Sequence, residues 1–183
     1  WSRSLRKRAW YSVPMGATFD HVHIYAQDLP RSLNFYTEVL GAEVVGKIPK
    51  EVGFNHILLL GGQFMAVSAF PPGITPREPA AVADGALQVG FGVAHIGLNV
   101  ASLDELLPKL ERAGITPHSS PRGGSPVRYV YFTGPDGVVF EVTQYQVSAK
   151  LEPAIKALAL FHRGVHAAKR VIGKRLLAAA TGS

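Results

Sequence analysis

The sequence predicts an α+β fold in which two βαβββ modules pair into a cupped mixed sheet, with an amphipathic helix at the C-terminal end. Alternating strands that carry His21 and His95 begin the two halves of the chain, and the same order of helix and strand patterns follows each. The two histidines lie 74 residues apart. We divide the chain into a basic leader (1–14), a first module (15–72), a linker (73–92), a second module (93–148) and a basic helical tail (149–183).

Composition limits the classes of function. The chain has 183 residues, 47% of them hydrophobic, which suits one domain or two small modules that share a core. The absence of cysteine excludes disulfides, thiolate metal sites and a cysteine nucleophile. The net charge is +6, but the basic residues gather at the two ends and the body between them is acidic, so we expect no nucleic-acid partner.

The first fourteen residues contain arginine and serine, no acid and no apolar stretch typical of a secretory signal. A transit peptide and a non-native remnant both fit this composition. We favour the remnant, with Met15 as the natural start, because the folded pattern begins directly after it. No apolar run approaches the roughly 18 residues of a membrane-spanning helix, and we expect a cytoplasmic protein.

The strand at 19–25 is the first candidate for chemistry. Because side chains alternate along a strand, His21, His23 and Tyr25 share one side, and the apolar residues between them share the other. Two imidazoles therefore face one compartment, where they can bind a metal or carry a proton. The ordinary alternative is a pair of half-buried, hydrogen-bonded histidines.

A helix and three strands complete the first module. Asp28 is a suitable N-cap for a helix with one apolar face, and Gly41 suits the residue just after its end. Strands follow at 43–48, 56–60 and 64–70, the last two joined by a glycine hairpin. The Pro, Gly and Ala of the linker indicate a connector, with a loop that covers a site as the alternative.

The second module repeats this order after a strand at 93–100. Ser102 and Glu105 form a capping box, and Pro108 predicts a kink or a late start of the helix. Two strands follow, at 127–133 and 138–145, around a Gly-Pro-Asp-Gly turn.

These phrases together resemble the vicinal oxygen chelate superfamily, which includes glyoxalase I, bleomycin resistance protein and extradiol dioxygenases. The similarity covers about residues 18–146. The phrases that carry it are Asp20-His21-Val22, Arg31-Ser32-Leu33-Asn34-Phe35-Tyr36, Leu40-Gly41, Ala94-His95-Ile96, Pro135-Asp136-Gly137 and Phe140-Glu141.

The resemblance implies a divalent metal on the concave face of the sheet, with His21, His95 and Glu141 on the family's ligand positions. Two histidines and one carboxylate leave three positions for substrate, water or oxygen. A metal-free member, like the family's drug-binding proteins, is the alternative.

The fourth ligand of glyoxalase-type members comes from the last strand of the first module. The 74-residue offset places Val67 there, opposite Glu141, and only Gln63, several residues away, could substitute. A three-ligand site resembles both the extradiol dioxygenases and the fosfomycin-type transferases. The segment from Tyr131 to Glu141 resembles the extradiol signature, although Gly134 breaks its polar position.

We therefore expect a non-haem Fe(II) extradiol-type dioxygenase that cleaves a small phenolic or enolic substrate. The alternative metals are Mn, Ni, Co and Zn, and the alternative enzyme is a glyoxalase- or epimerase-like lyase or isomerase. The expected catalytic residues are His23, Tyr131 and His118, and the expected substrate-binding residues are Tyr25, Asn99, Arg122 and Arg128. Each also has an ordinary role as a hydrogen-bonding, core or solvated residue.

The tail predicts a basic amphipathic helix. We expect its apolar stripe to pack on the domain, in preference to a membrane or a second subunit. The stripe comprises Leu151, Ile155, Leu158, Val165, Ile172 and Leu176. His162 and His166 have metal-ligand spacing, but no acid completes a site, so we treat them as surface residues. The expected partners are a small-molecule substrate and a second copy of the chain, as a homodimer.

Overall fold

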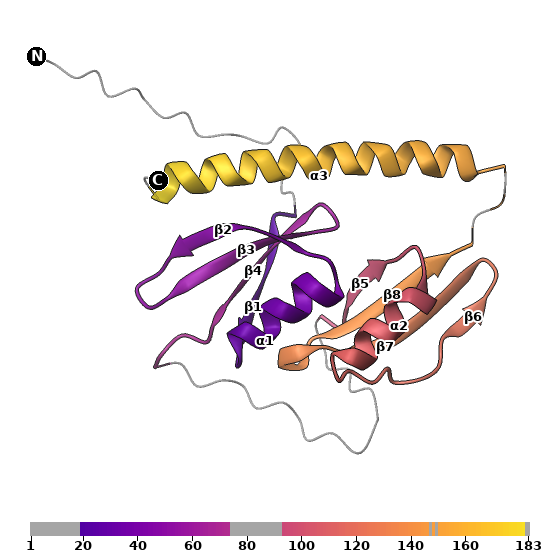
Figure 1. Ribbon diagram of the computed structural model, residues 1–183, viewed down its shortest axis with the longest axis horizontal. Helices are drawn as coiled ribbons and strands as arrows, with labels where there is room; N and C mark the ends of the chain where they lie inside the picture. The colour runs from indigo at the N-terminus through magenta and orange to yellow at the C-terminus, as the bar shows by residue number, and fades with distance from the viewer. Residues whose placement is uncertain (1–18, 74–92, 147, 149, 182–183) are drawn as a thin grey trace, which may run out of the picture.

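The computed structural model describes residues 19–73, 93–146, 148 and 150–181, and it confirms both predicted modules (Figure 1). The leader and nearly all of the linker lie outside the described residues. The first module contains β1 (His21–Ala26), α1 (Leu29–Asn34) with a π-helical continuation η1 (Phe35–Val39), β2 (Glu43–Pro49), β3 (Phe54–Leu60) and β4 (Gln63–Ala69). The second contains β5 (Ile96–Asn99), α2 (Leu103–Arg112), β6 (Arg122–Gly124), β7 (Val127–Thr133), the 3-10 turn η2 (Pro135–Gly137) and β8 (Val139–Tyr145). A long helix, α3 (Glu152–Thr181), follows.

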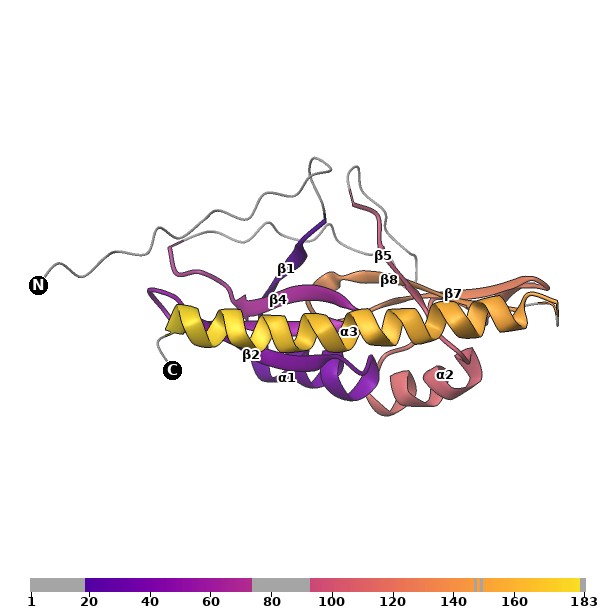
Figure 2. The same cartoon turned by 90° about the horizontal axis from the view of Figure 1, so that it is seen from above.

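The two modules form two separate four-stranded sheets of the same design. The strand orders are β1-β4-β3-β2 and β5-β8-β7-β6, with the first pair of each sheet parallel and the others antiparallel. Helices α1 and α2 cover the same side of the strands (Figures 1 and 2). We call the opposite surface of the two sheets the open face. Strands β1 and β5 each lie at one edge of their sheet, His21 is the first residue of β1, and His95 directly precedes β5.

The predicted helix caps are present. The Asp28 side chain accepts a hydrogen bond of 3.0 Å from the Arg31 N–H, and Ser102 accepts one of 3.2 Å from the Glu105 N–H. Gly41 follows the first helix at a φ of 73°, in the left-handed region that glycine tolerates. Pro108 lies inside α2, which still begins directly after its Ser102 cap, so the helix does not start late.

One apolar core joins the modules on the side of α1 and α2. Phe35 of η1 packs against Phe132 and Phe140 of the second sheet, with ring centroids 6.2 and 5.8 Å away. A Cβ atom on Gly134 would lie 2.9 Å from Phe140 and 3.2 Å from Phe35, so only glycine fits between them. The aromatic contact therefore fixes how the second module sits against α1.

Asp136 adds a polar connection between the modules. Its carboxylate accepts hydrogen bonds from the Gln27 N–H at 2.9 Å and from the buried Ser32 hydroxyl at 2.6 Å. The residue has a φ of 63°, which aspartate tolerates better than most residues do. Burial and the nearby Asp136 charge both raise the pKa of the enclosed Tyr36 hydroxyl.

The tail helix docks on the first sheet with only its C-terminal half. Glu43 of β2 pairs with Arg170 at 3.6 Å and Lys174 at 3.4 Å, and the Lys169 ammonium donates to the Gly62 carbonyl at 2.7 Å. A Cβ atom on Gly173 would lie 3.1 Å from both Phe64 and Val45, so the helix backbone comes close to the sheet there. Packing on the domain is thus confirmed for this half alone.

The predicted apolar stripe is not the face that packs. Five of its six residues are exposed by 45–66% of their surface, because the helix turns a different face to the sheet. The exposed members are Leu151, Ile155, Leu158, Ile172 and Leu176. No helix among the described residues is long and apolar enough to cross a membrane.

Replacing Asp136 tests the connection between the modules. Asp136→Ala leaves the Ser32 hydroxyl and the Gln27 N–H without their acceptor, and we expect it to lower the free energy of unfolding by about 1–3 kcal/mol. Asp136→Asn keeps an oxygen acceptor and tolerates the same backbone conformation, so it should recover part of the loss. Urea denaturation measures both, and equal stabilities of the Ala variant and the parent chain would contradict this role.

A second prediction concerns acid stability. His56 is buried on β3, and burial and then Lys47 lower its pKa in the folded chain, while a backbone hydrogen bond with Val67 opposes them. Because the folded pKa is below the unfolded value, the unfolded chain binds more protons, and stability falls as pH drops below about 6.5. His56→Gln should flatten the pH dependence of the unfolding free energy between neutral pH and about pH 5. The exposed His162→Gln is the control, and an unchanged slope in His56→Gln would contradict the prediction.

Candidate metal centre

Strand alternation places the predicted ligands on the open face. Ile24 and Ala26 lie in the core, so His21 and His23 of the same strand point the other way. In the second sheet Phe140 and Val142 are fully buried, and Glu141 between them turns to the open face.

His95 and Glu141 meet directly. The His95 Nε2 atom lies 2.9 Å from the Glu141 Oε2 atom, and both side chains are about a quarter to a third exposed, at 33% and 24%. Gly97 is the register partner of Glu141 on the neighbouring strand, and no atom lies within 4 Å of the place where its Cβ would stand. The pair therefore presents one nitrogen and one oxygen donor beside free space.

Tyr131, one of the expected catalytic residues, lies beside this pair. It is the cross-strand partner of Glu141, and its ring lies edge-on to the His95 imidazole at 5.4 Å between centroids. Burial, a hydrogen bond to the Glu141 carboxylate and that carboxylate's charge raise the pKa of Tyr131. At neutral pH the hydroxyl is thus a donor that holds one orientation of the carboxylate.

His21 lies apart from them. Its Nδ1 atom is 2.6 Å from the Asp20 carboxylate, which leaves Nε2 as the nitrogen available to a metal. The Gln63 amide donates to the Phe19 and Asp20 carbonyls at 3.2 and 3.4 Å and so holds the start of the strand. Within the described part of one chain, no three His, Asp or Glu side chains are gathered closely enough to hold a metal. That His21 shares a metal with His95 and Glu141 stays a prediction.

His23 is held by neighbours rather than free on the face. Its Nε2 atom lies 3.0 Å from the Ser68 hydroxyl, and its ring packs on Tyr25 at 4.7 Å between centroids. Burial, then the charges of Lys50 and His21, lower the pKa of His23, so the imidazole is neutral at neutral pH. The ring of Tyr25 also contacts Phe70 edge-on at 5.4 Å between centroids and has the Lys50 ammonium 5.5 Å from its centre, but Tyr25 is still 42% exposed.

The sequence analysis assigned Val67 to the fourth ligand position, and the structure shows that this assignment is wrong by one residue. Val67 lies in the core and is fully buried, so it cannot face a metal on the open face. In the two parallel pairs, His23 lies beside Ala66 and Gly97 lies beside Glu141, so the offset is 74 residues on the edge strands but 75 on their partners. Ala66 therefore corresponds to Glu141, and the conclusion that the first module supplies one ligand is unchanged.

The other predicted residues divide between the two faces. His118 donates its backbone N–H to the Tyr131 carbonyl and has a ring nitrogen 2.9 Å from the Thr133 hydroxyl, which places the ring at the end of β7. Arg122 is the cross-strand neighbour of Tyr129 on the open face. The side-chain amide of Asn99 is used within the second sheet, where it donates a hydrogen bond to the Thr143 carbonyl.

The structure does not bring Arg128 to the open face. It shares the side of Val130, which lies in the core, and its guanidinium pairs with both oxygens of Asp104 at 3.2 and 3.3 Å. We therefore remove it from the substrate-binding residues. Tyr129, whose ring lies 5.9 Å from that of Tyr131, is a residue of the face that the sequence analysis missed. The sequence could have shown this, because Tyr129 and Tyr131 are two residues apart on one strand and so share a face.

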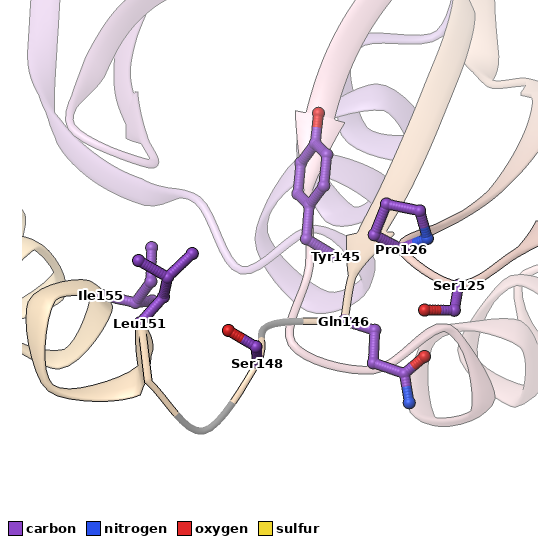
Figure 3. Close-up of a pocket in the computed structure, with 7 residues that line it drawn as sticks. All are labelled: Ser125, Pro126, Tyr145, Gln146, Ser148, Leu151 and Ile155. Carbon is purple, nitrogen blue, oxygen red and sulfur yellow. The ribbon is translucent and has the colours of Figure 1, made fainter.

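A groove of about 600 Å³ lies elsewhere, between the ends of β7 and β8 and the first turns of α3 (Figure 3). Tyr145, Pro126, Leu151 and Ile155 line it, together with short polar side chains. It contains none of the predicted ligands and no carboxylate or imidazole, so it is not the candidate centre.

Comparisons with known proteins agree with the fold. The family model described as Glyoxalase/Bleomycin resistance protein/Dioxygenase superfamily matches residues 18–142. Lactoylglutathione lyase GLX1 of Arabidopsis thaliana is 28% identical over 135 residues, which are 69% of this chain and 44% of that protein. A putative lactoylglutathione lyase of Brassica oleracea var. gemmifera is 27% identical over 171 residues, 87% of this chain and 56% of that protein. The chain spans about half the length of these curated relatives.

Solved structures show the same fold at low identity. The fosfomycin resistance protein FosX of Listeria monocytogenes has a TM-score of 0.53 at 17% identity, covering 73% of this chain and 97% of that one. TnmS3, an antibiotic binding protein from Streptomyces sp. CB03234, has a TM-score of 0.51 at 19% identity, covering 71% and 97%.

Proposed function

Since the chain belongs to the Glyoxalase/Bleomycin resistance protein/Dioxygenase superfamily, we propose that it is a metal-dependent, glyoxalase-like lyase or isomerase that acts on a small molecule. The contact of His95 with Glu141, with Tyr131 hydrogen-bonded to the same carboxylate, carries the proposal. The names of the curated relatives support lyase chemistry. The dioxygenase expected from the sequence has no such support, and Gly134 departs from the extradiol signature because Phe35 and Phe140 leave room only for glycine.

The donor set fits a divalent ion. One imidazole nitrogen and one carboxylate oxygen lie 2.9 Å apart, and such donors suit Mn, Fe, Co, Ni and Zn. A FosX variant from Listeria monocytogenes has been solved with Mn(II), so we no longer give iron preference over the other metals. When bound, such an ion supplies Lewis-acid chemistry that polarises a carbonyl and acidifies the neighbouring C–H bond.

The protein groups around the pair have separate tasks in this proposal. Tyr131 orients Glu141 through its hydroxyl, and Tyr129 extends the aromatic surface on which the substrate lies. His118, hydrogen-bonded to Thr133, is the imidazole on this sheet available to accept a proton from the substrate. The exposed Arg122 guanidinium, next to Tyr129, is placed to bind an anionic substrate group.

We further propose that the functional unit is a homodimer in which His21 of one chain completes the centre formed by His95 and Glu141 of the other. Two observations support this arrangement. The described residues of one chain do not gather the three ligands, and His21 is about half exposed on an edge strand with its Nδ1 already oriented by Asp20. A second chain would bring the missing imidazole without rearranging the shared core.

Metal binding tests the centre itself. We expect the full chain to bind one Mn(II) or Ni(II) per chain by calorimetry, and we expect Glu141→Ala to weaken the affinity at least about 100-fold because a ligand is lost. Tyr131→Phe keeps all three ligands and should change the affinity far less. Glu152→Gln, an exposed carboxylate on α3, is the control for general loss of charge. Absence of metal binding would make a metal-free small-molecule-binding protein the better candidate; TnmS3 is described as an antibiotic binding protein.

Hybrid dimers test how the centre is shared. His21→Ala and His95→Ala chains should each fail to bind metal, but unfolding and refolding them together should restore part of the binding and of the lyase activity on hemithioacetals. Recovery is expected because one centre of each hybrid dimer then has all three ligands. A mixture of His95→Ala and Glu141→Ala chains is the matched control, since both lack the same half. If the first mixture recovers no more than the control, His21 is not supplied by a second chain.

A further inference from the structure

The long helix α3 lies outside the part of the chain that the family model matches, and nothing in the proposed reaction uses it. It runs along one side of the molecule, outside both sheets (Figures 1 and 2). From residue 151 to 164 every position is exposed. Among the described residues, the contacts of α3 with the first sheet come from its second half.

The docked face of α3 is mostly basic, with one glycine and one leucine. The residues that contact the first sheet are His166, Lys169, Arg170, Gly173, Lys174 and Leu177, and the Leu177 side chain lies against Gly46 of β2. An amphipathic helix that packs on its own domain normally does the reverse and buries its apolar stripe. The docking of α3 is thus achieved by ion pairs with Glu43 and a close backbone approach.

Most large apolar side chains of α3 are exposed, with exposed fractions from 47% to 66%. They are Leu158, Leu160, Phe161, Val171, Ile172 and Leu176. At 100° per residue Leu160, Phe161, Val171 and Ile172 lie on the side opposite the docked residues, Leu158 and Leu176 lie at the edge next to Lys169, and Arg175 lies within the apolar arc. An exposed apolar surface of this length on the outside of a helix indicates a docking surface.

Charge selects the partner. Glu152 is the only acid in α3, and Lys156 neutralises it at 2.7 Å. Arg163 and Arg175 have no ion-pair partner among the described residues, so they leave the exposed part of the helix positive. A second α3 would bring like charges together, whereas an anionic surface would neutralise them.

We propose that the outward face of α3 binds the surface of an anionic lipid bilayer, with the helix lying in the plane of the membrane. Leu160 and Phe161 insert among the acyl chains near the headgroups, while the flanking arginines and lysine meet the lipid phosphates. The helix lies on the membrane rather than crossing it, consistent with the absence of a spanning helix among the described residues. Glu43 and its cations hold the catalytic modules to the second half of the same helix.

Vesicle co-sedimentation of the full chain tests the proposal. The chain should sediment with vesicles of equal parts phosphatidylcholine and phosphatidylglycerol, and it should not sediment with phosphatidylcholine alone. Leu160→Gln with Phe161→Gln removes two exposed apolar side chains while keeping good helix formers, and it should weaken binding at least about tenfold. Val52→Gln, which removes a similarly exposed side chain far from α3, is the matched control and should bind like the parent chain.

A second variant tests the contribution of positive charge to vesicle binding. Arg163→Gln with Arg175→Gln should weaken binding to the anionic vesicles, and added salt should weaken binding of the parent chain in the same direction. Circular dichroism and thermal unfolding establish that each variant keeps its helix and its fold. These variants leave the metal centre untouched, so metal binding is expected to be unchanged in all of them.

Three results would overturn the proposal. The first is no sedimentation with anionic vesicles, and the second is equal binding by the parent chain and the Leu160/Phe161 double variant. The third is self-association of the parent chain in sedimentation velocity that the double variant abolishes, with no vesicle binding. That last result would assign the outward face of α3 to a second copy of the chain.

Discussion

Alternation along the strands is the constraint on which the rest of this structure depends. In each sheet one set of side chains enters the core under α1 and α2, and the other set faces away from those helices. Phe140 and Val142 are fully buried, and this alone turns Glu141 to the surface where His95 and Tyr131 lie. The same rule takes Arg128 away from that surface and delivers it to Asp104 beside α2. The candidate centre is therefore a consequence of core packing as much as of its own polar contacts.

The modules are joined on the core side and not on the side of the chemistry. Phe35, Phe132 and Phe140 form the apolar part of this joint, and Asp136 adds hydrogen bonds to the first module. The sheets themselves share no ladder of hydrogen bonds, so nothing forces the histidine-bearing ends of β1 and β5 together. One chain brings His95 and Glu141 together but does not gather His21 with them, which is the physical basis for the homodimer that we propose.

The tail helix docks on the first sheet mainly through charged residues, a glycine and Leu177, while most of its large apolar side chains stay exposed. A helix that buried its whole apolar stripe on the domain would have mainly charged residues left on its surface. In the membrane proposal, this arrangement separates attachment to the modules from attachment to the lipid surface.

The sequence by itself determined the two modules, their helix caps and the side of the first strand on which His21 and His23 lie. These features depend on short-range patterns, namely alternation, capping residues and glycines after helices, which a local stretch of chain contains completely. Such patterns could not show that Ala66, and not Val67, corresponds to Glu141. The register of a parallel pair is set by how two distant strands pack and not by their spacing in the chain. The position of Arg128 could have been predicted from the sequence. It lies two residues from the apolar Val130 on the same strand, so both share the side that α1 and α2 cover.

Only the tertiary structure decided which groups meet. It placed Tyr131 against Glu141, left His21 apart from both, and turned the apolar side of α3 outward. Periodicity shows that a helix has an apolar face, but whether that face is buried depends on the competing contacts that the rest of the fold offers. Here Glu43 and the close approach at Gly173 favoured the opposite face of α3.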